Sequence, residues 1–219
     1  MKATLLITAV AGLALAACSR EPSAPGPSSA ANVPAGAYSL DAAHSTLTFR
    51  VSHLGFSSFT GEFKQFDAQL QFDPQNVPAS QVTVTVDPRS LDVPRPPEGF
   101  IELLLNDEWL AAARYPEMTF RSKQVEEIGP DRMRIHGELE LKGITQPVTL
   151  DATFNGGYAG HPLEPRARIG FSARGTLKRS AFGIKIGVPE PGSTFGVGDD
   201  VEIIIETELT GPPLAKARS

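Results

Sequence analysis

An all-β fold is indicated by residues 66–72, Phe66-Asp67-Ala68-Gln69-Leu70-Gln71-Phe72, in which apolar and polar side chains alternate strictly. Successive side chains of a β-strand point to opposite faces, so this pattern turns one face toward an apolar interior and the other toward water. The same period of two recurs in several other stretches along the chain. These stretches are residues 46–51, 82–86, 133–141, 148–154, 169–173 and 201–205.

Turn signals separate these expected strands. Seven or eight short strands joined by turns predict an antiparallel sandwich or a closed barrel. The turn signals are Asp73-Pro74, Gly129-Pro130-Asp131, Lys142-Gly143, Asn155-Gly156-Gly157 and Gly198-Asp199-Asp200.

Composition excludes several classes of protein. The 219 residues include 20 Lys and Arg against 25 Asp and Glu, a formal net charge of -5, which argues against a general nucleic-acid-binding protein. Cys18 is the single cysteine, so an intrachain disulfide and a Cys-based zinc site are excluded. The histidines, His44, His53, His136 and His161, lack the spacing of metal ligands, and neither a metal nor a cofactor is expected.

The N-terminus has the layout of a secretory signal. Met1-Lys2 is basic, and the apolar run at residues 5–17 is shorter than the roughly 20 residues that span a membrane. Leu15-Ala16-Ala17-Cys18 resembles the lipobox of bacterial lipoproteins. There the cysteine thiol receives a diacylglyceryl group, the signal is cut before the cysteine, and the new N-terminus is acylated. Ser19 then favours the outer membrane over retention at the inner one. The alternative is an ordinary signal peptide with an incidental Cys18.

These signals predict the organisation of the chain. Residues 1–17 are the signal peptide, and residues 18–36 are the lipidated cysteine and a tether with four prolines among Ser, Ala and Gly. One barrel domain is expected at residues 37–211, followed by a tail at 212–219.

One segment lacks the period of two. Residues 102–105 and 107–114 are rich in Leu, Ala and Glu, which predicts two short helical pieces, with Asn106 or Asp107 as an N-cap and Pro116 as a stop. This insert either packs outside the sheet or caps one end of a barrel. In the second case Phe100, Trp109 and Leu110 point into the barrel.

From Tyr38 to Leu209 the chain resembles the YceI-like domain family, because five elements occur in that family's order. They are Tyr38-Ser39-Leu40-Asp41 with His44-Ser45, Val51 to Phe56 and Gly61-Glu62-Phe63; Tyr115 to Ser122; Gly137 to Thr145; Arg179-Ser180-Ala181-Phe182-Gly183; and Val197 to Val201.

The resemblance implies an extended, lipocalin-like antiparallel β-barrel of about eight strands with an apolar pore. It also implies a periplasmic protein that holds a polyisoprenoid lipid of the quinone type and catalyses no reaction. Two departures leave the headgroup open: Ala181 stands where the family often has Asp, and Arg95-Pro96-Pro97-Glu98 stands where it commonly has Arg-Asp.

The candidate ligand-binding residues follow from two observations together: the alternate strand positions that are expected to point inward, and the resemblance to the family. A barrel of about eight strands is either filled by its side chains or holds one slender ligand, so the inward residues form either a solid core or a pore. The resemblance favours the pore. The candidates are Phe49, Val51, His53, Phe66, Phe120, Ile135, Phe171, Arg179, Phe182 and Ile203.

The polar candidates have alternative roles. His53 binds a ligand headgroup or a backbone carbonyl, and Arg179 binds a headgroup or pairs with Asp41 or Asp199. His44 and Ser45 near Asp41 suggest a catalytic triad, but adjacent residues on a strand face opposite ways and no nucleophile elbow is present, so no catalytic residue is expected.

The sequence therefore predicts a lipid-binding lipoprotein whose partners are a long isoprenoid and, through Cys18, the membrane. No pattern demands a homodimer, although an exposed strand edge is compatible with one. The alternative function is that of a structural or stress-related envelope protein with a solid barrel core.

Overall fold

The computed structural model describes residues 32–160 and 163–214. The predicted signal peptide, Cys18 and most of the tether lie outside these residues, as do His161 and the end of the tail. The boundaries predicted for these parts therefore stay predictions.

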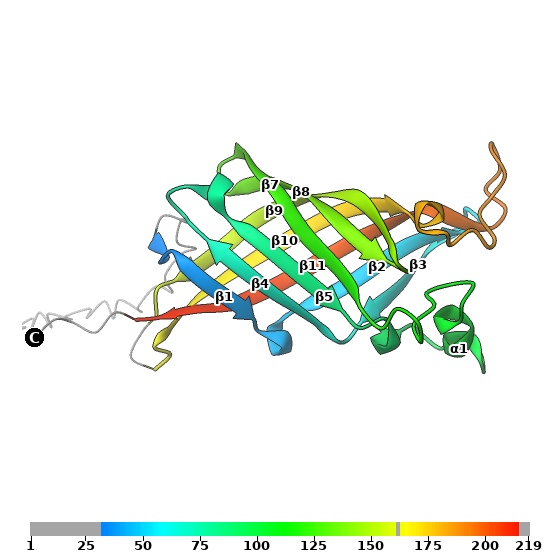
Figure 1. Cartoon of the computed structure of the whole chain (residues 1–219), viewed down its shortest axis with the longest axis horizontal. Coiled ribbons are helices and arrows are strands. Elements are labelled where there is room, and N and C mark those ends of the chain that lie inside the picture. Colours follow the sequence, from blue (N-terminus) through cyan, green and yellow to red (C-terminus); the bar gives the residue numbers. More distant parts are fainter. Residues whose placement is uncertain (1–31, 161–162, 215–219) are drawn as a thin grey trace, which may run out of the picture.

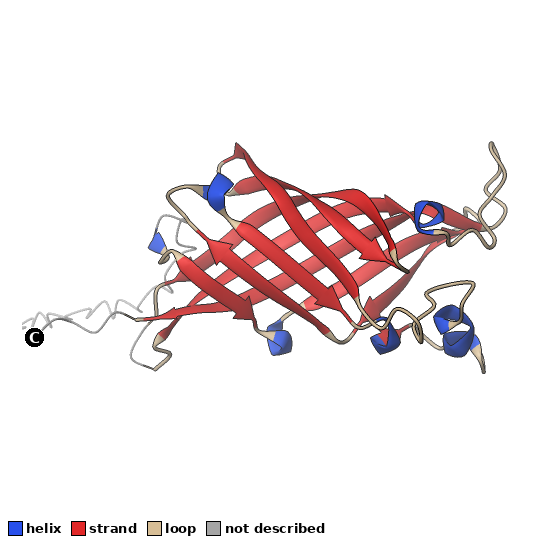
Figure 2. Ribbon diagram, viewed as in Figure 1, coloured by secondary structure: helices blue, strands red, loops and turns tan. Residues whose placement is uncertain are grey.

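The described chain forms one antiparallel sheet of eleven strands (Figures 1 and 2). The strands are β1 (Gly36–Leu40), β2 (Thr46–His53), β3 (Ser57–Phe63), β4 (Phe66–Phe72), β5 (Gln81–Val86), β6 (Leu91–Asp92), β7 (Met118–Gly129), β8 (Arg132–Leu141), β9 (Ile144–Tyr158), β10 (Arg166–Lys178) and β11 (Val197–Pro213). Single turns of 3-10 helix lie at η2 (Ala42–His44), η3 (Val77–Ala79), η4 (Pro88–Ser90) and η5 (Arg179–Phe182).

The sheet closes on itself where β1 pairs with β11, with Leu40 opposite Leu209. Three positions around the barrel are each filled by two short strands in succession: β1 and β2, β3 and β4, and β5 and β6. The eleven strands therefore occupy eight positions. This confirms the predicted extended antiparallel barrel, whose long axis runs across Figure 1.

Two of the predicted turns are wrong. Asn155-Gly156-Gly157 lies inside β9 and Gly198-Asp199-Asp200 lies inside β11. The pairing register shifts beside both stretches, so their extra residues are absorbed as bulges in long strands. The signals at Asp73-Pro74 and Lys142-Gly143 do form turns.

The insert at residues 93–117 contains one helix, α1 (Phe100–Leu105). The second predicted helical piece is wrong. Asn106 Oδ1 accepts hydrogen bonds from the backbone N–H groups of Glu108 and Trp109, and Ala111 adopts a φ of 50°. The chain therefore turns back in successive tight turns rather than continuing as a helix. No helix in the described part of the chain is both long enough and apolar enough to cross a membrane.

One half of the barrel interior, here called the packed half, is filled by aromatic rings. Phe72, Phe154 and Phe171 contact one another with ring centroids 5.4–6.2 Å apart, and Tyr38 meets Phe72 edge to face. Tyr38 is fully buried and donates a hydrogen bond to Pro34 O at 2.6 Å. Its burial raises the pKa of the phenol to about 12. β1 begins and β11 ends at this end of the barrel (Figure 1).

Candidate functional site

The other half of the barrel, here called the hollow half, encloses a cavity of about 560 Å³. Side chains from β2, β3, and β5 to β11 form its wall, and almost all of them are apolar. The polar side chains on the lining are Thr48, His53, Ser57 and Arg179. The volume lies within the ~300–1,000 Å³ typical of small-molecule sites, and its lining suits an apolar ligand.

Glycines on neighbouring strands let large side chains lie flat against this wall. Phe49 lies over Gly61, directly opposite on β3, where an added Cβ would sit 2.5 Å from the ring. Phe120 covers Gly137 in the same way, and Leu150 covers Gly175. A side chain at any of these glycines would push its neighbour toward the axis of the barrel, so the glycines contribute to the width of the cavity.

The insert caps the hollow half. Among the described strands, β6 pairs only with β3, which leaves the wall between β6 and β7 without a continuous ladder. The insert connects these two strands and lies at this end of the barrel (Figure 1). Its side chains on the cavity lining are Phe100, Leu104, Trp109 and Leu110. Of the two predicted placements, the cap is therefore the one that forms.

Arg179 is held inside the wall by backbone carbonyls. Only 5% of it is exposed, and four of its N–H groups donate to Ile184 O, Ile186 O, Val197 O and Gly198 O at 2.7–3.1 Å. Its guanidinium carbon also lies 5.5 Å from the centre of the Trp109 ring. Arg179 thus fastens the loop at residues 183–196 to the start of β11.

The charge of Arg179 lacks a close counterion. No carboxylate among the described residues lies within ion-pair distance of the guanidinium, so the predicted pairing with Asp41 or Asp199 is not found. Asp199 instead accepts hydrogen bonds from the Ser180 N–H and hydroxyl. Burial lowers the pKa of Arg179 from its ordinary value, and the charge of Asp199 opposes that shift. A positive charge beside an apolar cavity attracts an electron-rich headgroup.

Of the residues on the cavity lining, His53 and Ser57 are exposed; together with the half-buried Val197, which pairs with His53, they are here called the mouth of the cavity. His53 and Ser57 end β2 and begin β3, and both are exposed. Within the described residues the His53 imidazole makes no hydrogen bond, so the backbone carbonyl predicted as its partner is not found. Its ring nitrogens stay available to a ligand.

The predicted ligand-binding residues fall into three places. Six of them line the cavity: Phe49, Val51, His53, Phe120, Arg179 and Ile203. Phe66, Ile135 and Phe182 pack in or against the apolar cluster of the hollow half without lining the cavity, Ile135 also packs against the cluster of the packed half, and Phe171 belongs to the packed half. Alternation correctly predicted that Phe171 points into the barrel, but in the structure its side chain contacts other aromatic rings rather than the cavity. Whether the six lining residues bind a ligand stays a prediction.

Three lining residues of β3, Ser57, Phe59 and Phe63, were missed. Phe59 and Phe63 both face the cavity and share one parity with Gly61. This alternation is present in the sequence, but the glycine between the two rings interrupts the apolar pattern. Leu104 of α1 was also missed, because its helix is too short to show a period.

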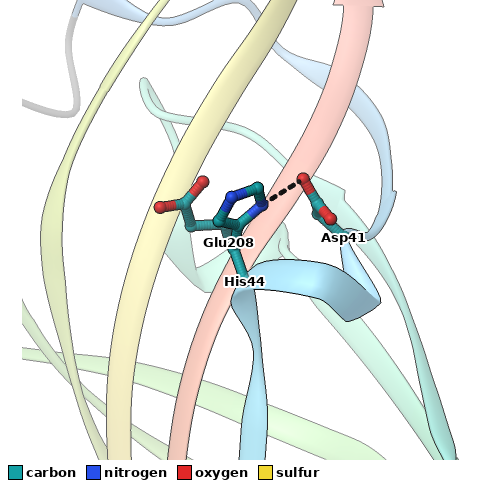
Figure 3. Close-up of side chains that lie close together, drawn as sticks. All are labelled: Asp41, His44 and Glu208. Atoms are coloured by element: carbon teal, nitrogen blue, oxygen red, sulfur yellow. Dashed lines mark hydrogen bonds and ion pairs between the residues drawn. The ribbon is translucent and has the colours of Figure 1, made fainter.

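A second group of polar side chains, Asp41, His44 and Glu208, lies on the outside of the barrel near the packed half. His44 Nδ1 lies 3.0 Å from Asp41 Oδ2, as drawn in Figure 3, and one ligand atom of each residue fits within 4.8 Å of the others. Arg168 Nη1 already lies 2.6 Å from both Asp41 Oδ2 and Glu208 Oε2. The group is therefore an ion-pair network that joins β10, β11 and the residues after β1.

The hydrogen bonds of this network do not produce a triad. Ser45 Oγ donates to Asp41 O at 2.8 Å and accepts from the Glu208 N–H at 3.1 Å. These bonds hold Ser45 on the backbone rather than on the His44 imidazole. Hydrogen bonds from His44 and Arg168 lower the pKa of the Asp41 carboxyl from its ordinary value.

Comparison with known proteins identifies the family. The sequence pattern described as the YceI-like domain matches residues 38–209. The chain belongs to the YceI-like domain family. Bacterial YceI-like proteins are periplasmic, and the family is one of binding proteins.

Individual YceI-like proteins support this assignment. Protein YceI of Escherichia coli O157:H7 is 36% identical over 182 residues, which cover 82% of this chain and 90% of that protein. The crystal structure of Burkholderia cenocepacia BcnA has a TM-score of 0.65 at 27% identity and covers 77% of this chain and 98% of BcnA. A polyisoprenoid-binding domain from Saccharophagus degradans shares the fold, with a TM-score of 0.59 at 15% identity, covering 80% and 98% of the two chains.

Proposed function

We propose that this protein is a periplasm-facing lipoprotein that holds the tail of a long apolar lipid, a polyisoprenoid of the quinone type, in the hollow half of its barrel. The observation that carries the proposal is the enclosed apolar cavity of about 560 Å³. Each buried methylene-sized unit contributes about 0.8 kcal/mol before entropic costs, so an apolar tail needs no polar contact to be retained.

The headgroup is placed at the mouth. Arg179 has five N–H groups, four of which donate to backbone carbonyls, and the imidazole of His53 is exposed beside the opening. An oxygen of a quinone or an alcohol accepts a hydrogen bond from either residue. The tail then lies against Phe49, Val51, Phe120 and Ile203, and Phe66, Ile135 and Phe182 pack in or against the cluster that contains Phe120.

The comparisons and the N-terminus support the ligand class and the location. The Saccharophagus degradans neighbour is named as a polyisoprenoid-binding domain, although its likeness to this chain concerns the fold. The lipobox resemblance at Cys18 supports removal of residues 1–17 and anchoring to the outer membrane. Two or more acyl chains are needed for stable anchoring, which a lipidated and acylated cysteine supplies.

Native mass spectrometry of protein purified from its own envelope tests the proposal. We expect one dominant co-purifying lipid, lost from a Val201→Trp variant that fills the cavity and retained in an exposed Arg174→Ser control. Protein that is free of lipid and takes up no added polyprenol contradicts the proposal and favours the structural alternative. The same spectra report whether the protein is a monomer or a homodimer.

A separate variant tests the anchor. Cys18→Ser removes the thiol that lipidation requires, so the variant is expected to leave the membrane fraction. If it still fractionates with membranes as the parent does, lipid anchoring through Cys18 is wrong, and the cavity is unaffected by that result.

A further inference from the structure

Three apolar side chains, here called the mouth patch, protrude beside the opening of the cavity. Phe56 is 87% exposed at the tip of the β2–β3 hairpin, and Phe195 is 82% exposed in the loop before β11. Ile186 of the same loop is 41% exposed. Single exposed apolar residues are common on proteins, but two nearly bare phenylalanines at one end of a molecule indicate a contact surface.

The two segments that carry the mouth patch are fastened to each other. Leu54 N–H donates to Gly196 O at 2.8 Å, and a Cβ at Gly55 would sit 2.9 Å from Thr194 Cβ. Within the loop, Val197 N–H donates to Gly187 O at 2.8 Å. The rings therefore protrude from one joined tip rather than from two independent loops.

The patch adjoins the cavity directly. Phe56 precedes Ser57, which lines the mouth, and Phe195 lies two residues before Val197, which also lines it. The lining continues inward from these residues without a charged side chain except Arg179. An apolar chain that enters here passes from the exposed rings to the cavity wall.

The tip is nearly neutral. Residues 53–57 and 183–197 together contain one lysine, Lys185, and one acidic residue, Glu190. A surface that binds by charge attraction is rich in one sign, whereas this tip offers aromatic rings among Gly, Pro and Ser. This composition fits insertion into the interface of a bilayer and predicts weak dependence on salt.

The tip lies at the far end of the barrel from the chain termini. In Figure 1 the loop before β11 is at one end of the long axis, and β1 begins and β11 ends at the other. The described chain therefore begins and ends at the packed half, at the opposite end of the barrel from the mouth patch.

We propose that the mouth patch inserts into the interfacial region of a lipid bilayer, so that an apolar ligand passes between bilayer and cavity without crossing water. This inference rests on the proposed function, because the exchange needs a lipid ligand. A long tail moving through water exposes all of its apolar area at once, and a mouth seated in the bilayer removes that barrier. Phenylalanine rings on a neutral surface are suited to the interfacial region of a bilayer, between the headgroups and the acyl chains.

Local tryptophan reporters test the insertion in the full chain. Trp109→Phe removes the single native tryptophan, and Phe56→Trp, Phe195→Trp or Leu163→Trp then adds a reporter. Leu163 is a matched control because it is 92% exposed but lies just before β10, at the end of the packed half. We expect phosphatidylcholine vesicles with brominated acyl chains to quench the reporters at 56 and 195 with a blue shift, but not the one at 163.

Because each reporter senses only its own surroundings, a lipidated N-terminus that brings the protein to the vesicle does not imitate the result. Equal quenching at positions 56, 195 and 163, or no quenching at 56 and 195, overturns the inference. If 56 and 195 remain in water while native mass spectrometry still finds a bound lipid, the inference fails and the proposed function stands. Quenching at the tip with no bound lipid would mean that the patch inserts but that the proposed function fails, and the exchange of a ligand between bilayer and cavity fails with it.

Transfer kinetics give a second measurement. Replacing both rings, Phe56→Ser with Phe195→Ser, is expected to slow uptake of a polyprenol from phosphatidylcholine vesicles at least about tenfold, since each phenylalanine contributes strongly to interfacial affinity. Uptake of the same polyprenol from detergent solution stays unchanged, and Leu163→Ser changes neither. If the double variant instead loses binding to an envelope protein and keeps its rate with vesicles, the patch is a protein-binding surface and the inference is wrong.

Discussion

In the packed half of the barrel Phe72, Phe154 and Phe171 meet across the interior, whereas in the hollow half Phe49 and Phe120 lie flat on glycines of the neighbouring strands. Both halves are built from the same residue types, and strands β7 to β11 run through both of them. What differs is how many rings meet. Phe72 contacts three other rings across the interior of the packed half, whereas the ring contact found among the described residues of the hollow half is the Phe49–Phe63 pair on neighbouring strands. Rings that converge from several strands fill the barrel, and rings that lie along its wall leave a cavity.

The largest expected effect comes from opening the packed half. Phe171→Ala removes a buried ring from the cluster and is expected to lower the free energy of unfolding by about 3–5 kcal/mol. Phe63→Ala in the hollow half borders space that is already empty, so we expect it to cost less than half as much. Urea unfolding of both variants measures the difference. Equal losses would mean that the two halves are packed alike.

This comparison also bears on Phe171 as a ligand-binding candidate. Phe49→Asp places a charge on the cavity lining and is expected to abolish ligand retention in a folded protein. Phe171→Asp buries a charge among rings and is expected to unfold the barrel first. Circular dichroism beside lipid analysis separates the two, and a folded Phe171→Asp protein without lipid would place Phe171 on the ligand path after all.

The next largest effect concerns Arg179, which fastens the loop at the mouth. Arg179→Met removes donors from four backbone carbonyls and is expected to cost about 2–4 kcal/mol. Hydrogen exchange is expected to rise in residues 183–198 before it rises in β1 or β4. The control is Arg174→Met, an exposed partner of Glu202, for which we expect at most about 1 kcal/mol. Uniform exchange across the barrel would contradict a local role.

A smaller effect is expected from a methyl group under Phe49. Gly61→Ala forces that ring toward the cavity axis, at a cost of about 1–3 kcal/mol and with less lipid bound per protein. Gly170→Ala meets only ordinary contacts and serves as the control. Thermal unfolding and lipid quantification measure both changes. Undiminished lipid in Gly61→Ala would show that this glycine does not set the width of the cavity.

The smallest effect comes from pH and acts beside the packed half. The pKa of Asp41 is lowered in the folded state by hydrogen bonds from His44 and Arg168, so its ionised form stabilises the fold above about pH 4. That contribution is lost as pH falls through the folded-state pKa. The melting temperature is therefore expected to fall more steeply below about pH 4 in the parent than in Asp41→Asn. If the melting temperature falls equally with pH in the parent and in Asp41→Asn, Asp41 does not contribute to the loss of stability in acid.

Alternation predicted most of the strands, because it depends only on neighbours along one strand, but it left a sandwich and a barrel open, and the resemblance to the family selected the barrel. It also placed Phe49, Val51 and Ile203 on an inward face, and the structure puts all three on the cavity lining. Alternation does not report what lies across the interior, which depends on pairing registers between distant strands. Phe171 and Phe49 are therefore equivalent in the sequence and different in the fold.

Two other features depended on contacts that no local pattern encodes. Residues 107–114 have helical composition, but capping by Asn106 and the left-handed φ of Ala111 turn them back on themselves. The partners of Arg179 are carbonyls of the loop at 183–196 and the start of β11, and a carbonyl has no signature in the sequence. Charge alone suggested a carboxylate partner for this residue.

Val84 and Ile205 line the cavity and also pack against the cluster that contains the stacked rings, so the packed half gives the cavity a floor. A tail that enters at the mouth stops at this floor, so any length beyond the depth of the hollow half remains outside. The protein would then select lipids by the length of the tail. The depth of the cavity would set where the headgroup lies, and no contact would be specific for an individual unit of the tail. Moving the floor by one ring would change the preferred chain length without altering the wall.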